Sequence, residues 1–175
     1  MRFIVSRFYT PKSVTLEYLV YEYSFCGNWG FDWGNLSRVV DYEVSINYLT
    51  LRSYYRKVGF FDLAGYSPYI GWIPRRLHIP LGEKKDILPK NDSLGDIIGE
   101  KLPYFYDKTT NWICCGDPEQ KGRVVHFTEQ MAVSLNDQGK LTALWLKPVF
   151  ISPESMVDEF SSATGTDKSK IVIAQ

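Results

Sequence analysis

The chain has 175 residues, with 20 basic and 20 acidic side chains and therefore no formal net charge. Its length suits one domain with its own core, and a hydrophobic content of 45% excludes a largely disordered chain. The charge balance argues against direct binding of nucleic acid, because neutralising phosphates normally requires an excess of basic residues.

The first half of the chain is expected to form strands. Residues 1–9 and 14–25 are rich in β-branched and aromatic side chains. Residues 36–48 alternate between polar and apolar side chains, which predicts a half-buried strand. Residues 49–58 fit either a strand or a short helix. Residues 60–80 contain several glycines and prolines, so we expect them to form mostly ordered loop.

The second half is expected to mix strands with short helices. Residues 83–90 are polar and are predicted to be mobile, whereas residues 92–102 carry the capping and stop signals of a short helix. Strand character returns at residues 104–106, 111–115 and 122–135.

The C-terminal part contains the strongest local signals. Residues 131–146 predict a β-hairpin in which Gly139 takes a left-handed conformation. A terminal helix is expected to begin after Ser152, with Ser152 as its cap and Pro153 at its first position, and to end near residue 162. The apolar residues 171–173 would be costly to expose, so they are predicted to form an edge strand or to contact a neighbour.

These elements predict a single α+β domain over residues 1–162, built on a mainly antiparallel sheet with a few short helices. Residues 163–175 are predicted to form a flexible C-terminal tail.

The cysteines and the N-terminus indicate the compartment. The three cysteines, two of them adjacent at Cys114 and Cys115, do not form the even, spread pattern of a disulfide framework, so we expect reduced thiols and a cytoplasmic protein. The apolar run near Met1 is too short for a signal peptide, and no apolar run is long enough to span a membrane.

Candidate catalytic groups are few. His78 and His126 both have apolar neighbours, where a structural role is more common than catalysis. Cys114 or Cys115 could pair with His126 as a nucleophile, but no helix N-terminus follows the cysteines to lower a thiol pKa. Adjacent cysteines also point to opposite faces of a strand, which does not suit a closed zinc site. We therefore expect no enzyme activity, no metal and no cofactor.

Two segments predict partner-binding surfaces. One is an aromatic loop that could pack on the core, grip a protein or stack on a sugar. The other mixes tyrosine, tryptophan and arginine, as interface cores do, although the same mixture could stack on single-stranded nucleic acid or simply cover a sheet surface. The candidate residues are Trp29, Phe31 and Trp33 in the loop, and Arg52, Tyr54, Tyr55, Arg56, Tyr69, Trp72, Arg75 and Arg76 in the second segment.

Residues 104–150 also resemble a known class of proteins. The residues that carry the resemblance are 111–118, which end in Gly-Asp-Pro, then 124–127, and the Leu- and Trp-rich strand at 141–148. This pattern is similar to the C-terminal half of bacterial immunity proteins that accompany polymorphic toxins, including those of contact-dependent growth inhibition systems. The resemblance implies a non-enzymatic cytoplasmic protein that binds a cognate toxin domain and blocks its active site.

Three hypotheses therefore stand at this point. The first is an immunity protein, the second is a carbohydrate-binding or small-ligand-binding module that uses Trp29 and Trp33, and the third is a thiol enzyme that uses Cys114 or Cys115 with His126. The sequence leaves the oligomeric state and the identity of the toxin open.

Overall fold

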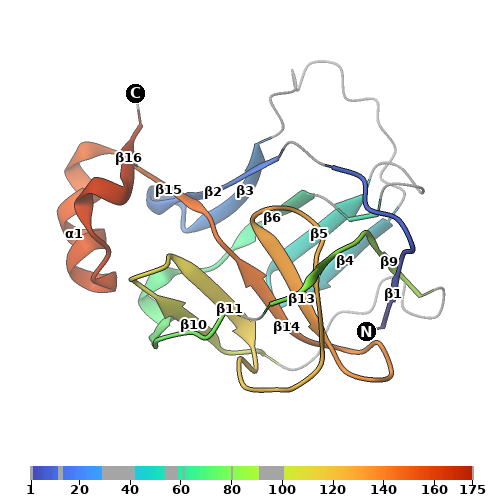
Figure 1. Ribbon diagram of the computed structural model, residues 1–175. Helices are drawn as coiled ribbons and strands as arrows, with labels where there is room; N and C mark the ends of the chain where they lie inside the picture. The colour runs from blue at the N-terminus through green and yellow to red at the C-terminus, as the bar shows by residue number, and fades with distance from the viewer. Residues whose placement is uncertain are drawn as a thin grey trace, which may run out of the picture.

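The computed structural model describes residues 2–11, 14–28, 42–53, 59–60, 62–79, 81–90 and 101–174. Strands dominate this part of the chain, and one α-helix, α1 (Glu154–Thr164), lies near its C-terminal end (Figure 1). The predicted fold class, mainly antiparallel α+β with few helices, is confirmed. Within the described ranges, no helix has both the length and the apolar character needed to cross a membrane.

The first of the two large sheets, sheet A, is assembled from strands of the first half of the chain and from the C-terminus. Its strands pair antiparallel, except that β15 runs parallel to both β2 and β16. The order across sheet A is β16 (Ile171–Ile173), β15 (Val149–Ser152), β2 (Thr15–Leu19), β3 (Ser24–Asn28), β6 (Asp62–Tyr66), β5 (Leu49–Ser53) and β4 (Tyr42–Ile46).

The second large sheet, sheet B, contains the predicted hairpin. β13 and β14 pair antiparallel, and Gly139 between them has a φ of 73°, which confirms that prediction. Two short strands close the edges of sheet B by parallel pairing. The order is β7 (Ile73–Pro74), β10 (Tyr104–Asp107), β11 (Trp112–Gly116), β14 (Leu141–Leu146), β13 (Met131–Leu135), β12 (Arg123–His126) and β8 (Glu83–Lys84).

The inner faces of the two sheets share one core. Leu16 and Tyr18 of sheet A and Ile113 and Cys115 of sheet B are all fully buried in this cluster. These residues lie two apart in their strands, and because successive side chains point to opposite faces of a sheet, each pair points into the same core. A pair of small strands, β1 (Phe3–Val5) and β9 (Ile87–Pro89), adds a third sheet beside this core.

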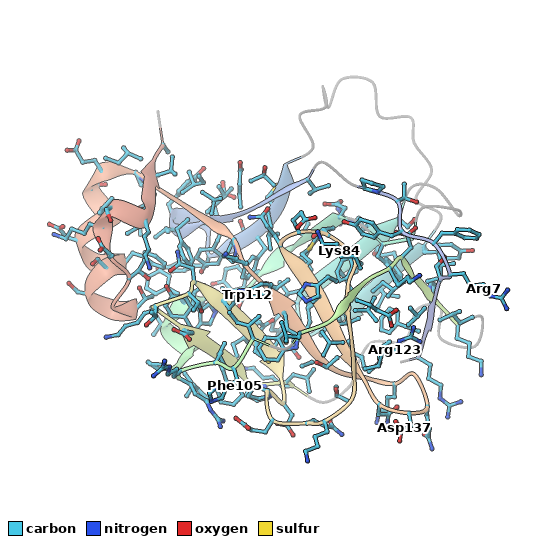
Figure 2. The ribbon with its side chains drawn as sticks, in the orientation of Figure 1. Arg7, Lys84, Phe105, Trp112, Arg123 and Asp137 are labelled. Atoms are coloured by element: carbon cyan, nitrogen blue, oxygen red, sulfur yellow. The ribbon has the colours of Figure 1, made fainter. Side chains whose placement is uncertain are left out.

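The outer face of sheet B has its own apolar cluster. Trp112, Cys114 and Trp145 are buried there, and Phe105 packs against them; Phe105 and Trp112 are labelled in Figure 2. The described residues between β7 and β8, 75–79 and 81–82, link the two opposite edges of the sheet, and Leu77 among them is buried in the cluster. We call this segment the strap.

Several predicted elements need correction. Residues 14–25 form two strands, β2 and β3, because η1 (Val20–Glu22) and the left-handed Tyr23 reverse the chain. Residues 60–80 were predicted to be mostly ordered loop; their described part also contains β6, which lies between β3 and β5 in sheet A, and the short edge strand β7. Residues 83–90, predicted to be mobile, form the strands β8 and β9. The helix predicted over residues 92–102 lies outside the described residues, apart from its last two.

Gly65 explains why β6 was missed. It has a φ of 146°, and a Cβ at this position would lie 2.1 Å from the carbonyl oxygen of Tyr48. The glycine therefore does not interrupt the strand. It allows β6 to pass close to the turn between β4 and β5.

The C-terminal residues also differ from the prediction. Helix α1 continues to Thr164, Gly165 ends it in a left-handed conformation, and η5 (Lys168–Lys170) leads into β16. Residues 163–174 are therefore part of the fold rather than a tail, and the predicted edge strand at 171–173 is confirmed. The predicted Ser152 cap is wrong, because its hydroxyl bonds to the Pro153 carbonyl and α1 has no side-chain cap.

Candidate functional site

Many of the predicted binding residues cannot be placed. Trp29, Phe31, Trp33, Tyr54, Tyr55 and Arg56 lie outside the described residues. The aromatic-loop hypothesis therefore stays a prediction.

Two of the remaining candidates belong to the core. Tyr69 is 3% exposed and Trp72 is 6% exposed. The Trp72 indole N–H donates to the Ser67 hydroxyl at 3.0 Å, and its ring packs against Tyr18 and Tyr106. Their burial assigns these side chains to packing between the sheets and not to contact with a partner.

The three described arginine candidates do not converge on one site. Arg52 lies in β5 of sheet A and pairs with Glu43 at 3.4 Å. Arg75 begins the strap, where it pairs with Glu119 at 2.6 Å and lies over the ring of Phe105. Arg76 is exposed and has no ion-pair partner among the described residues.

The structure does not bring the proposed thiol pair together. Strands β14 and β13 lie between β11, which carries the cysteines, and β12, which carries His126. Both thiols are buried, on opposite faces of sheet B as predicted. Burial raises the pKa of Cys114, and it raises that of Cys115 to about 12, so neither thiol is activated.

A concave surface with an aromatic rim is the strongest candidate site. We call it the tyrosine pocket, a cavity of about 370 Å³ beside the turn between β4 and β5. The residues that line it include Asn47, Tyr48, Tyr66, Pro68, Leu102 and Tyr104. Among the described residues that line it, Lys101 is the one with a charged side chain.

Asn47 builds one wall of the tyrosine pocket. Its φ is 53°, a left-handed conformation that asparagine tolerates better than most residues. Its side-chain amide donates to the Leu102 carbonyl and accepts from the Leu102 N–H, both at 2.9 Å. This pair of bonds fixes the turn against the segment that leads into β10.

The rim presents large apolar side chains to solvent. Tyr48 is 69% exposed and Tyr66 is 49% exposed, and both line the pocket. The Tyr66 N–H donates to the Tyr48 carbonyl at 3.2 Å, which holds the two rim positions together. The rim is therefore preorganised by backbone contacts.

The hydroxyl of Tyr104, one of the residues that line the tyrosine pocket, has no hydrogen-bond partner among the described residues. This hydroxyl is buried, and Asn47, Ser67 and Cys115 are its polar neighbours. Burial raises the pKa of Tyr104, so the hydroxyl keeps its proton and remains a donor. A buried donor of this kind costs free energy until an acceptor reaches it.

The tyrosine pocket is chemically suited to receive an apolar or aromatic side chain. Sequence reasoning singled out the stretch from Arg52 to Arg76, which contains Tyr66, but missed Tyr48. The exposure of Tyr48 could have been inferred from its position directly after Asn47, where the alternating stretch 36–48 ends and the next predicted element begins. Tyrosine at such a turn is exposed by the turn geometry.

Metal chemistry has no candidate site in this part of the chain: the described residues include no group of three or more His, Cys, Asp or Glu side chains placed to hold an ion. No family model and no curated protein matches this chain in sequence. The class of protein is thus defined by its fold, a mainly β domain with two large sheets and a tyrosine-lined pocket at one of them.

Proposed function

We propose that this protein binds another protein through the tyrosine pocket, and that it is an immunity protein which neutralises a cognate bacterial toxin domain by covering its active site. The observation that carries the proposal is the pair of exposed tyrosines, Tyr48 and Tyr66, in the lining of a concave surface. Tyrosine-rich pockets that accept an anchor side chain are typical of the centres of protein interfaces.

The resemblance of residues 104–150 to immunity proteins supports the choice of a toxin as partner. Tyr104, whose hydroxyl lies beside the pocket, is at the start of that segment. We place the protein in the cytoplasm, where the free thiols of Cys26, Cys114 and Cys115 stay reduced.

Co-purification with the toxin domain encoded next to its gene tests the proposal. The tagged full chain should retain the toxin domain on a column and abolish its activity at equimolar concentration. Failure to form a complex, or a complex in which the toxin stays active, would reject the immunity role.

Substitutions at the rim test the surface. Tyr48→Ala and Tyr66→Ala should each weaken binding by about 2 kcal/mol, roughly 30-fold in Kd, because each removes a central aromatic contact. Phe8→Ala is the matched control, since Phe8 is 76% exposed but does not line the pocket. Equal effects at all three positions would show that the tyrosine pocket is not the contact surface.

A further inference from the structure

A second cavity differs from the tyrosine pocket in its charge. It has a volume of about 640 Å³ and lies where the start of the strap, the turn after β10 and the C-terminal end of α1 meet. We call it the basic groove. The lining residues used below are Arg76, Asp107, Lys108, Thr109 and Gly165.

The basic groove holds positive charge that nothing in the described structure neutralises. Arg76 and Lys108 are exposed and have no carboxylate partner among the described residues. Lys170 lies beside the groove, because its Nζ donates to the carbonyl of Thr109 at 2.9 Å, but its charge also acts on the carboxylate of Asp167.

Two neighbouring cations contribute less, because each already has a partner. Arg75 pairs with Glu119 at 2.6 Å, and Lys168 pairs with Asp158 at 2.5 Å. Within this cavity, the cations without a carboxylate partner are therefore Arg76 and Lys108.

The carboxylate in the lining, that of Asp107, already accepts hydrogen bonds from the main chain. Asp107 is 4% exposed and accepts hydrogen bonds from the backbone N–H groups of Leu77, Thr109 and Thr110. Set against the two unpaired cations Arg76 and Lys108, this one carboxylate leaves the groove with a net positive charge. Its backbone bonds hold it away from the exposed arginine and lysine.

The same backbone bonds position the two free cations. Arg76 lies between Arg75, whose N–H donates to the Tyr106 carbonyl, and Leu77, whose N–H donates to Asp107. Lys108 follows Asp107 directly, and its Cδ lies 2.9 Å from where a Cβ on Gly165 would be. Both main-chain positions are thus fixed before any ligand binds, which lowers the ordering cost of binding.

We propose that the basic groove binds an acidic segment of a partner protein, with a side-chain carboxylate held between Arg76 and Lys108. An arginine fork matches a carboxylate in two parallel hydrogen bonds, and the lysine adds a second positive charge. Nucleic acid fits less well, because it requires basic residues spread over an extended surface, and the whole chain carries no net charge. The inference does not depend on the tyrosine pocket.

An NMR titration of the ¹⁵N-labelled full chain with a blocked hexapeptide of alternating Glu and Asp tests this assignment without knowledge of the natural partner. Saturable amide shifts should appear at residues 75–76, 107–109 and 163–165, and should weaken as salt is raised from about 50 to about 300 mM. The matched hexapeptide of Gln and Asn should cause no such shifts.

Charge reversal separates the site from general attraction. The double variant Arg76→Glu/Lys108→Glu should weaken binding of the acidic peptide at least about tenfold, whereas Lys147→Glu, on an exposed residue outside the groove, should leave it unchanged. Shifts scattered over the surface, or equal effects of the two variants, would overturn the proposal. Tighter binding of a hexadeoxynucleotide than of the peptide at the same residues would also overturn it, in favour of nucleic acid.

Discussion

Replacing Asp107 by Asn tests whether one buried carboxylate holds the strap against sheet B. Its Oδ2 accepts a hydrogen bond from the Leu77 N–H at 3.0 Å, and its Oδ1 accepts from Thr109 at 2.8 Å and from Thr110 at 3.4 Å. An amide keeps only one acceptor oxygen and places an NH₂ group against one of these donors. The N–H of Leu77 in the strap and the N–H groups of Thr109 and Thr110 in the turn after β10 therefore cannot all keep an acceptor.

The expected loss in the free energy of unfolding is about 2 kcal/mol. A hydrogen bond to a charged group contributes about 1.5–3 kcal/mol, and a buried donor left without an acceptor costs about 1–3 kcal/mol. A loss of about 2 kcal/mol lies within both ranges, because the amide oxygen of the variant can still accept from the donors on one side of Asp107.

The loss should also depend on pH. Burial alone would raise the pKa of Asp107, but the backbone N–H groups of Leu77, Thr109 and Thr110 lower it below its ordinary value. The carboxylate therefore contributes its full stabilisation above about pH 4, the pKa of an unfolded aspartate. That contribution disappears as the pH falls through the lower pKa of the folded state.

Urea unfolding at about pH 7 and about pH 3 measures both effects. The matched control is Asp137→Asn in the exposed turn between β13 and β14 (Figure 2), which should leave stability unchanged. Equal stability of the wild type and Asp107→Asn near neutral pH, or a difference that does not shrink in acid, would refute this reasoning.

Further predictions concern packing. Gly65→Ala should cost about 3 kcal/mol or more, because its Cβ would lie 2.1 Å from the Tyr48 carbonyl oxygen, whereas Gly71→Ala has open space and should leave the melting temperature unchanged. Leu77→Ala should lower the free energy of unfolding in urea by about 2–4 kcal/mol, and Leu81→Ala, on a fully exposed side chain, should not. Iodoacetamide should label Cys115 only after unfolding, as followed by mass spectrometry, because its pKa is about 12. A stable Gly65→Ala variant, equal losses at the two leucines, or rapid labelling of native Cys115 would each contradict the packing described.

Local patterns predicted the parts of the fold that local geometry controls. In the stretch 14–25, predicted to be strand, Leu16, Tyr18 and Val20 lie two residues apart and are all fully buried. The β13–β14 hairpin followed from two apolar runs and a glycine suited to a left-handed turn. The opposite orientations of Cys114 and Cys115 followed from the two-residue period of a strand. Such features need only neighbours in sequence.

Elements with weak local signals were predicted less well. β6 was hidden by Gly65, whose role is to admit the Tyr48 carbonyl from the turn between β4 and β5. Residues 83–90 were judged by their polarity, yet β8 and β9 are held by pairing with β12 and β1. In each case a partner distant in sequence stabilises the strand, and a window of local residues does not contain that partner.

The amino-acid sequence by itself determined that this is a mainly β protein, and it determined which side chains alternate toward a core. Only the tertiary structure decided which surfaces are available for binding. It buried Tyr69 and Trp72, exposed Tyr48 beside Leu102, and brought Arg76 and Lys108 to the end of α1. The physical reason is that backbone periodicity sets the direction of a side chain, whereas its exposure and its neighbours depend on the order in which distant strands pair.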